Sequence, residues 1–282
     1  MKVVLETSIT RYLDRVEDLL LKQEVTNNLM LGLLERGKNN IGVFTDGIRL
    51  GIVEQDGEPI YAFMQTPPNR WILAAIEGVD QDVIPEIVQF LHTNKYPVPG
   101  VVGPTEQAEA FAGLWKKATG KQAELKMKQL IYQLDEVKHI PDESGKLIAA
   151  TDEHLATVRD WLVKFGDQAN IEITKPQADS MARTFIQNES LYLWEVDGQI
   201  VSMANNSRKS KNGATVNAVF TPDEQKRKGY ATNVVAALSQ KLLNDGSKFC
   251  NLYTDLANPT SNSIYRKIGY YEVGDSVEYN FG

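Results

Sequence analysis

Residues 215–254 form the stretch that most limits what this chain can fold into. Thr215–Thr221 is rich in β-forming residues and stops at Pro222, and a short loop containing Gly229 follows. Apolar residues at helical spacing come next, at Val234, Val235, Leu238 and Leu242. A second strand is expected at Phe249–Thr254. Two strands joined by a helix predict a βαβ unit, in which the strands lie parallel in one sheet.

The loop in front of this helix is basic. Lys226, Arg227 and Lys228 precede Gly229 in a chain whose net charge is -7. A helix N-terminus offers unpaired backbone N–H groups and the positive end of the helix dipole, so it favours a phosphate group. Glycine lets a ligand come close to the backbone. Taken alone, the run also fits a basic turn that only contacts solvent.

Two motifs in the second half carry a family resemblance. The segment 221–232, TPDEQKRKGYAT, resembles the pyrophosphate motif of the GNAT-superfamily N-acetyltransferases: Arg or Gln, two residues, Gly, one residue, then Gly or Ala. Lys226 stands in the Arg or Gln place. The segment 255–273, DLANPTSNSIYRKIGYYEV, resembles the late motif of that family: Asn, a helix containing Tyr, then Gly-Tyr entering a strand. The resemblance covers roughly residues 146 to 282.

The residues of the late motif also predict a helix with a cap at each end. Asn258 suits a helix N-cap, Pro259 suits the first helical position, and Gly269 suits the C-cap. A short helix is therefore expected over residues 259–268.

The resemblance implies an acyl-CoA-dependent enzyme that moves an acetyl group from its co-substrate, acetyl-CoA, directly to a primary amine. The acceptor, a small molecule or a protein, stays unidentified. The family's cofactor contacts fall on the strand end, the basic loop, the helix start and the late motif: Val219, Phe220, Thr221, Lys226, Arg227, Lys228, Gly229, Tyr230, Ala231, Thr232, Asn258 and Ser261. A backbone N–H at Val219–Thr221 would hold the oxyanion.

Tyr265 stands where many family members have the residue that protonates the departing thiolate. A phenol can donate a proton at neutral pH because its ordinary pKa is about 10. The general base stays open among Glu172, Glu195, Asp197 and Glu278. The single cysteine, Cys250, lies in an apolar strand without a histidine at recognisable spacing, so we expect a buried structural thiol.

The chain length favours two folding units. Asp56-Gly57 and Asp197-Gly198, at an offset of 141, each predict a hairpin between apolar runs. A polar connector at 139–145 separates the halves, so we predict residues 1–142 as a degenerate GNAT-like domain and 143–282 as the catalytic domain. In the first half the acidic segment Gly78–Asp82 replaces the basic loop. The fold class is α+β (α/β), a tandem GNAT-like fold with a mixed central sheet flanked by helices.

The composition and the spacing of Cys and His residues argue against several classes of protein. A pI near 5.2 argues against a general nucleic-acid binder. No Cys/His cluster has metal-ligand spacing, so no metal is expected. No apolar run is long enough to span a bilayer, and the first 20 residues lack an uninterrupted apolar region; we expect a cytoplasmic protein without membrane contact. The oligomeric state stays open. A noncatalytic acyl-CoA-binding module and an interaction scaffold remain as alternatives.

Overall fold

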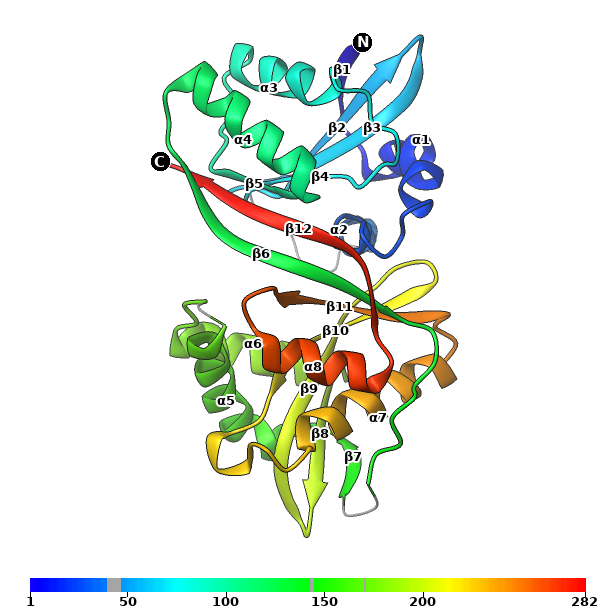
Figure 1. Cartoon of the computed structure of the whole chain (residues 1–282), viewed down its shortest axis with the longest axis vertical. Coiled ribbons are helices and arrows are strands. Elements are labelled where there is room, and N and C mark those ends of the chain that lie inside the picture. The colour runs from blue at the N-terminus through cyan, green and yellow to red at the C-terminus, as the bar shows by residue number, and fades with distance from the viewer. Residues whose placement is uncertain (40–46, 143–144, 170) are drawn as a thin grey trace. The chain divides into compact units, whose positions relative to one another are not determined.

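A computed structural model describes residues 1–39, 47–142, 145–169 and 171–282. Contacts between residues divide the chain into two compact units (Figure 1). Unit 1 consists of residues 1–131 and 273–282, and unit 2 consists of residues 132–272. The backbone therefore passes from one unit to the other twice, once after Ile131 and once after Glu272.

Unit 1 contains a mixed sheet with helices. Its elements are β1 (Lys2–Glu6), α1 (Ile9–Leu21), α2 (Asn28–Lys38), β2 (Arg49–Gln55), β3 (Glu58–Gln65), β4 (Trp71–Leu73), α3 (Val83–Thr93), β5 (Gly100–Gly103), α4 (Thr105–Thr119), most of β6 (Ala123–Leu134) and most of β12 (Tyr271–Phe281). The strand order is β1-β2-β3-β4-β5-β12-β6. Strands β4 and β5 are parallel, whereas β5 and β12 are antiparallel.

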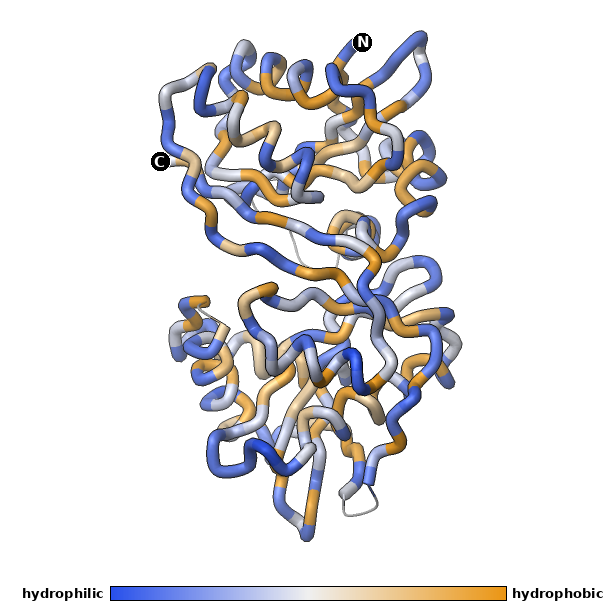
Figure 2. The backbone as a smooth tube through the Cα atoms, viewed as in Figure 1, coloured by the Kyte–Doolittle hydropathy of each residue, from blue (hydrophilic) through white to orange (hydrophobic). Residues whose placement is uncertain are grey.

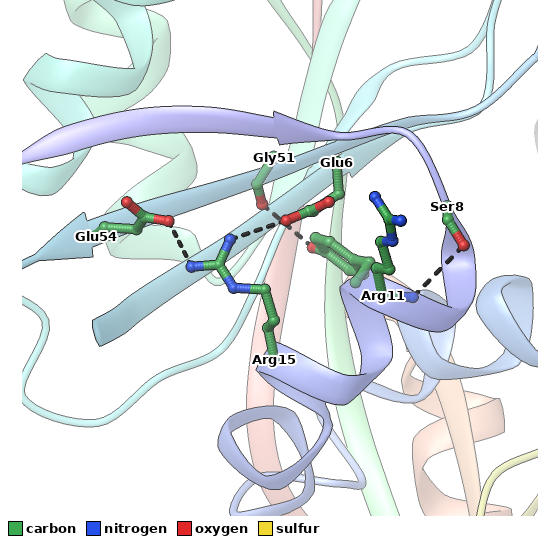
Figure 3. Close-up of polar contacts among 7 residues, drawn as sticks. Glu6, Ser8, Arg11, Arg15, Gly51 and Glu54 are labelled. Atoms are coloured by element: carbon green, nitrogen blue, oxygen red, sulfur yellow. Dashed lines mark hydrogen bonds and ion pairs between the residues drawn. The ribbon is translucent and has the colours of Figure 1, made fainter. Parts of the chain in front are cut away.

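Polar contacts of α1 fix this helix on the sheet of unit 1. Arg15 lies between Glu6 of β1 and Glu54 of β2 and forms ion pairs with both (Figure 3). These two carboxylates raise the pKa of the Arg15 guanidinium, the hydrogen bond to Glu54 contributing most. The buried Tyr12 hydroxyl donates to the carbonyl oxygens of Gly51 and Phe63 at 3.3 and 3.2 Å. Helix α1 is thus held by hydrogen bonds as well as by its apolar face.

Unit 2 contains the strand-helix-strand unit and the late helix that the sequence predicts. Its elements are β7 (Gly145–Ala149), the 3₁₀ turn η1 (Asp152–His154), α5 (Leu155–Gln168), α6 (Lys175–Gln187), β8 (Leu191–Val196), β9 (Gln199–Lys209), β10 (Gly213–Phe220), the 3₁₀ turn η2 (Asp223–Gln225), α7 (Tyr230–Asn244), β11 (Phe249–Asp255) and α8 (Pro259–Ile268). The strand order is β11-β10-β9-β8-β7. Strands β10 and β11 are parallel, which confirms the predicted βαβ unit.

Helices cover both faces of the sheet in unit 2. Leu191 and Leu193 of β8 join a buried cluster with Trp161 of α5 and Ala178 of α6. Tyr192, between these leucines, faces the other way, because its ring lies 5.9 Å from the Lys241 Nζ of α7. Side chains alternate along a strand, so α5 and α6 lie on one face and α7 on the other. Figure 2 shows hydrophobic colour along the strands and mostly hydrophilic loops between elements.

Both predicted Asp-Gly hairpins are confirmed. Asp56 and Gly57 join β2 to β3 with φ of 53° and 91°, and Asp197 and Gly198 join β8 to β9 with φ of 49° and 76°. Positive φ at both central residues is the type I′ turn, whose twist matches that of the flanking strands.

The contact division differs from the predicted boundary at residue 142 in two places. Unit 1 ends at Ile131, and it also includes residues 273–282 because β12 pairs with β5 through Val277↔Gly103 to Asn280↔Gly100. The mixed sheet flanked by helices is confirmed in each unit. Residues 143 and 144 of the predicted connector lie outside the described residues. The assignment of 1–142 and 143–282 as two GNAT-like domains stays a prediction.

Candidate functional site

Strands β10 and β11 separate in front of α7. Their parallel pairing runs from Gly213↔Phe249 to Thr215↔Asn251. Within the described residues it goes no further, although β10 continues to Phe220 and β11 to Asp255. The edge of β10 that faces β11 therefore has no strand partner beyond Thr215. A ligand could pair with this edge without displacing a described strand.

A bulge changes the direction of β10 within the unpaired part. The register with β9 shifts between Asn217 and Phe220, and Ala218 has φ of 47°. Phe220 points into the core, where its ring lies 5.8 Å from that of Trp161. The Ser202 hydroxyl contacts the Phe220 carbonyl at 3.0 Å and the Thr221 hydroxyl at 2.8 Å. Of the predicted strand residues, Phe220 and Thr221 are buried and Val219 is half-buried, so Phe220 can serve a ligand only through its backbone.

The basic loop has a backbone conformation that suits a phosphate site. Arg227 and Gly229 both lie in the left-handed region, with φ of 62° and 85°. A Cβ atom added at Gly229 would meet no atom within 4 Å, so this residue borders open space. Lys226 to Gly229 are exposed, and α7 starts directly after them at Tyr230.

Two of the loop lysines already have neighbours within the loop. The Lys226 Nζ lies 2.6 Å from the Asp223 carboxylate. Lys226 lowers the pKa of Asp223, mainly through this hydrogen bond. The Lys228 Nζ donates to the Gln225 Oε1 at 2.8 Å and lies 6.0 Å from the ring centre of Tyr230. Arg227 makes no such contact with a described residue.

The N–H groups at the start of α7 are the main feature of the site. The first intrahelical bond runs from the Asn233 N–H to the Gly229 carbonyl at 3.0 Å. Among the described residues, the backbone N–H groups of 227–232 have no hydrogen-bond acceptor. They belong to the residues that the sequence predicts for cofactor binding, from Arg227 to Thr232. Unpaired N–H groups beside a helix dipole form an anion site.

The late motif folds as predicted. Helix α8 spans 259–268, and the Asn258 side chain accepts the Ser261 N–H at 3.0 Å. Asn258 therefore acts as the N-cap and occupies the Ser261 N–H. Gly269, with φ of 119°, ends the helix.

Tyr265 is held between two other tyrosines. Its ring centre lies 6.2 Å from that of Tyr132 and 6.0 Å from that of Tyr270. Burial raises the pKa of the Tyr265 hydroxyl to about 12, so the phenol is protonated at neutral pH. Its hydroxyl has no hydrogen-bond partner among the described residues, whereas the Tyr270 hydroxyl contacts Ser239 at 2.8 Å and the Tyr132 hydroxyl donates to Glu272 at 3.1 Å. The only uncommitted hydroxyl of these three is that of Tyr265.

Two residues of the connector, His139 and Asp142, contact the helix behind the basic loop, and the sequence did not predict these contacts. Asn233, buried in the first turns of α7, donates to the Asp142 carboxylate at 2.6 Å and contacts the His139 Nε2 at 3.2 Å. Asp142 and His139 lie 91 and 94 positions before Asn233, so no local sequence pattern indicates these contacts. The connector thus packs against the helix that carries the basic loop.

The four base candidates lie in different surroundings. Glu195 forms an ion pair with Lys146 at 3.0 Å, and Asp197 forms the β8–β9 turn. Glu278 belongs to unit 1, where it lies 3.4 Å from Arg70. Glu172 is exposed. None has a contact that singles it out.

Cys250 is buried in β11, and its thiol contacts the Ser239 carbonyl at 3.6 Å. Burial raises the pKa of this thiol to about 12, so almost no reactive thiolate is present near pH 7. Among the described residues, no three His, Cys, Asp or Glu side chains gather in a way that could hold a metal ion. No described helix is long and apolar enough to cross a bilayer.

Comparison with known proteins adds to this geometry. Residues 196–279 match the family model of the FR47-like proteins. Solved structures with similar architecture include an acetyltransferase of the GNAT family from Colwellia psychrerythraea, with 13% identity, 100% of both chains covered and a TM-score of 0.61. They also include a tandem GNAT protein from the clavulanic acid biosynthesis pathway, with 11% identity, 99% of this chain and 98% of the other covered, and a TM-score of 0.62.

The chain has the tandem GNAT fold. A GCN5-related N-acetyltransferase from Sphaerobacter thermophilus shares it as well, at 10% identity and a TM-score of 0.60 over 98% of this chain and 94% of the other. No curated protein matches the sequence in a sequence search. The FR47-like match lies within the second half of the chain and includes the basic loop, α7 and α8.

Proposed function

We propose that this GNAT-fold protein is an N-acetyltransferase that moves an acetyl group from acetyl-CoA directly to a primary amine. The observation that carries this proposal is the run of free N–H groups at 227–232, directly behind the separated ends of β10 and β11. The N–H groups suit a diphosphate group, and the separated strand ends suit an extended chain attached to it. The FR47-like match over the same residues supports it.

The basic loop would bind the phosphates of the co-substrate. Backbone N–H groups of 227–232 donate to the diphosphate oxygens, and Arg227 adds a positive charge that has no partner among the described residues. Gly229 lets the ligand reach the backbone, because its surroundings are open. Lys226 would exchange its contact with Asp223 for one with a phosphate.

The unpaired edge of β10 would orient the acyl group. After the bulge at Ala218, the backbone of Val219 to Thr221 provides the N–H donor for the oxyanion that forms when the amine attacks the thioester. Donors fixed in advance at the place where negative charge develops usually provide a large part of the rate enhancement.

Tyr265 would act on the departing thiolate. Its hydroxyl stays protonated and without a partner among the described residues, so it can donate a hydrogen bond. A pKa near 12 exceeds the ordinary thiol value of about 8.5, so complete proton transfer to the thiolate is uphill. We therefore assign Tyr265 mainly to hydrogen-bonding the developing thiolate charge.

The test is an assay of CoA release from acetyl-CoA with a panel of primary amines, including amino acids, polyamines, aminoglycosides and peptides with a free N-terminus or lysine. The proposal predicts amine-dependent release of CoA and an acetylated amine of mass +42. Micromolar binding of acetyl-CoA without amine-dependent release across the panel would favour the noncatalytic acyl-CoA-binding module. Absence of acetyl-CoA binding by folded protein would favour the interaction scaffold.

The first half is proposed to support this site without binding a second acetyl-CoA. The loop before α3 is acidic, and the Asp80 carboxylate accepts the Asp82 N–H at 2.9 Å at the start of that helix. At the start of α3, the Asp80 carboxylate therefore already accepts a backbone N–H, whereas the N–H groups at the start of α7 have no acceptor among the described residues. Its negative charge also repels a phosphate.

A further inference from the structure

Unit 1 contains a surface pocket of about 570 Å³, formed where the end of α3, the chain after it and the end of α4 meet. Its floor consists of the buried side chains of Leu91, Val98 and Trp115. This volume lies within the range of small-molecule sites, which combine an apolar floor with a few polar groups. None of the residues assigned to the acetyl-CoA site lines this pocket.

The charged groups around the pocket have one sign. Lys95 and Lys121 are exposed at its rim, and His92 lies next to them with its ring 6.1 Å from that of Trp115. None of the described residues that line the pocket is acidic, although acidic residues outnumber Lys and Arg in the chain by 37 to 30. The charge around the pocket therefore favours an anion.

Lys95 has a backbone conformation that a lysine seldom adopts. Its φ is 55°, in the left-handed region. The Lys95 N–H donates to the His92 carbonyl at 3.1 Å and the Tyr96 N–H to the Leu91 carbonyl at 3.0 Å, which is the pattern of a helix C-terminus that usually contains glycine. A non-glycine residue in this conformation is a reason to look for a function. Lys95 is exposed and lines the pocket.

The Trp115 ring in the floor of the pocket is held in place by other aromatic rings. Its ring stacks on Phe111 at 6.1 Å and lies 6.2 Å from Phe281, and the residue is 5% exposed. Its indole N–H has no acceptor among the described residues. The part of Trp115 that lines the pocket is therefore a small, already ordered apolar surface that a ligand can contact.

We propose that this pocket binds a small aromatic carboxylate, with the ring against Trp115 and the carboxylate near Lys95 and Lys121. The apolar floor, which includes the Trp115 ring, favours a flat apolar body, and the two lysines favour an anionic end. All of these residues belong to unit 1, so the proposal does not depend on acetyl-CoA binding.

The test uses 2-naphthoate as the probe and the neutral 2-naphthamide as its matched control, titrated into the full chain by calorimetry. We expect 1:1 binding of 2-naphthoate with a dissociation constant below about 1 mM, and binding of the amide at least about tenfold weaker. The double variant Lys95→Glu/Lys121→Glu should weaken 2-naphthoate binding by about tenfold or more. The control Lys116→Glu/Lys117→Glu makes the same charge change at exposed α4 residues that do not line the pocket, and should stay within about threefold.

A second measurement locates the ligand. The indole N–H signal of Trp115, assigned by its loss in Trp115→Phe, should shift on addition of 2-naphthoate, while those of Trp161 and Trp194 should not. If the double glutamate variant does not fold, Lys95→Ala and Lys121→Ala replace it, each with an expected affinity loss of several-fold. Absence of saturable binding, equal binding of acid and amide, or a Trp115 signal that does not move would overturn the proposal.

Discussion

Lys226 and Asp223 form an ion pair at 2.6 Å inside the loop proposed to bind the phosphates of acetyl-CoA. A phosphate has to compete with this carboxylate for the ammonium group. Asp223→Asn should therefore tighten acetyl-CoA binding, by about 1.4- to fivefold, since exposed ion pairs contribute about 0.2 to 1 kcal/mol. Calorimetry measures this directly.

The matched control for that change is Glu224→Gln. Glu224 is the next residue, is exposed, and loses the same charge. Because it has no ion pair with a described residue, the control should tighten binding less than Asp223→Asn. Equal effects would show that net charge, and not the contact with Lys226, limits affinity.

Gly229→Ala should disturb the loop through its backbone alone. Residue 229 has φ of 85°, and a left-handed conformation costs an L residue about 1 to 2 kcal/mol. Space is not the limit, since a Cβ there meets no atom within 4 Å. We expect a comparable loss in the free energy of unfolding and weaker acetyl-CoA binding. Gly113→Ala in α4, where a Cβ also meets nothing within 4 Å and φ is not positive, should not destabilise the protein.

Tyr265→Phe removes the hydroxyl but keeps the ring between Tyr132 and Tyr270. If this hydroxyl contacts the departing thiolate, kcat should fall by about 10- to 100-fold while the affinity for acetyl-CoA stays within about twofold. Tyr271→Phe is the control, since that exposed hydroxyl contacts Asp135 and not the proposed site. Unchanged kcat in Tyr265→Phe would remove this residue from the mechanism.

The pH dependence follows from the same hydroxyl. Its pKa is raised to about 12, so the donor form persists through neutral and mildly alkaline pH and is lost only as pH rises through that value. The associated stability is complete below the unfolded value near 10 and declines between about pH 10 and 12. Profiles of log kcat against pH for the wild-type protein and Tyr265→Phe should therefore run parallel from pH 7 to 9.5. A descending limb in that range that is absent from Tyr265→Phe would contradict the assignment.

Cys250→Ala should retain the activity. The thiol lies in the core, and burial keeps its pKa near 12. Removing the sulfur leaves a small cavity, so some stability is lost, on the order of 1 kcal/mol. Loss of kcat without loss of stability would reopen a covalent mechanism through this residue.

Local patterns were enough to predict the βαβ unit and the last helix of the second half. The strand that stops at Pro222, the helix N-cap at Asn258 and the C-cap glycine at Gly269 are signals within a few residues, and α7, β11 and α8 form where they indicate. The basic loop in front of α7 was predictable because its position depends only on where one helix begins. Whether its residues bind acetyl-CoA remains a prediction.

Long-range pairings were not predictable in this way. The end of the chain from Val273 pairs with β5 of unit 1, since antiparallel pairing at Val277↔Gly103 depends on residues 174 positions apart along the sequence. The Asn233 contact with Asp142 and the packing of Tyr132 on Tyr265 arise from the same kind of distant contact. The spacing of apolar residues within a segment predicts a strand but does not show which other strand it pairs with.

Binding of acetyl-CoA by the loop 226–229 and the start of α7 is what the proposed function depends on. Its most direct test is calorimetric titration of acetyl-CoA into the full chain and into Gly229→Glu, which places bulk and negative charge in open space beside the free N–H groups. We expect 1:1 binding with a micromolar dissociation constant in the wild-type protein and an affinity loss of at least about tenfold in the folded variant. No binding by folded wild-type protein, or equal affinity in folded Gly229→Glu, would contradict it.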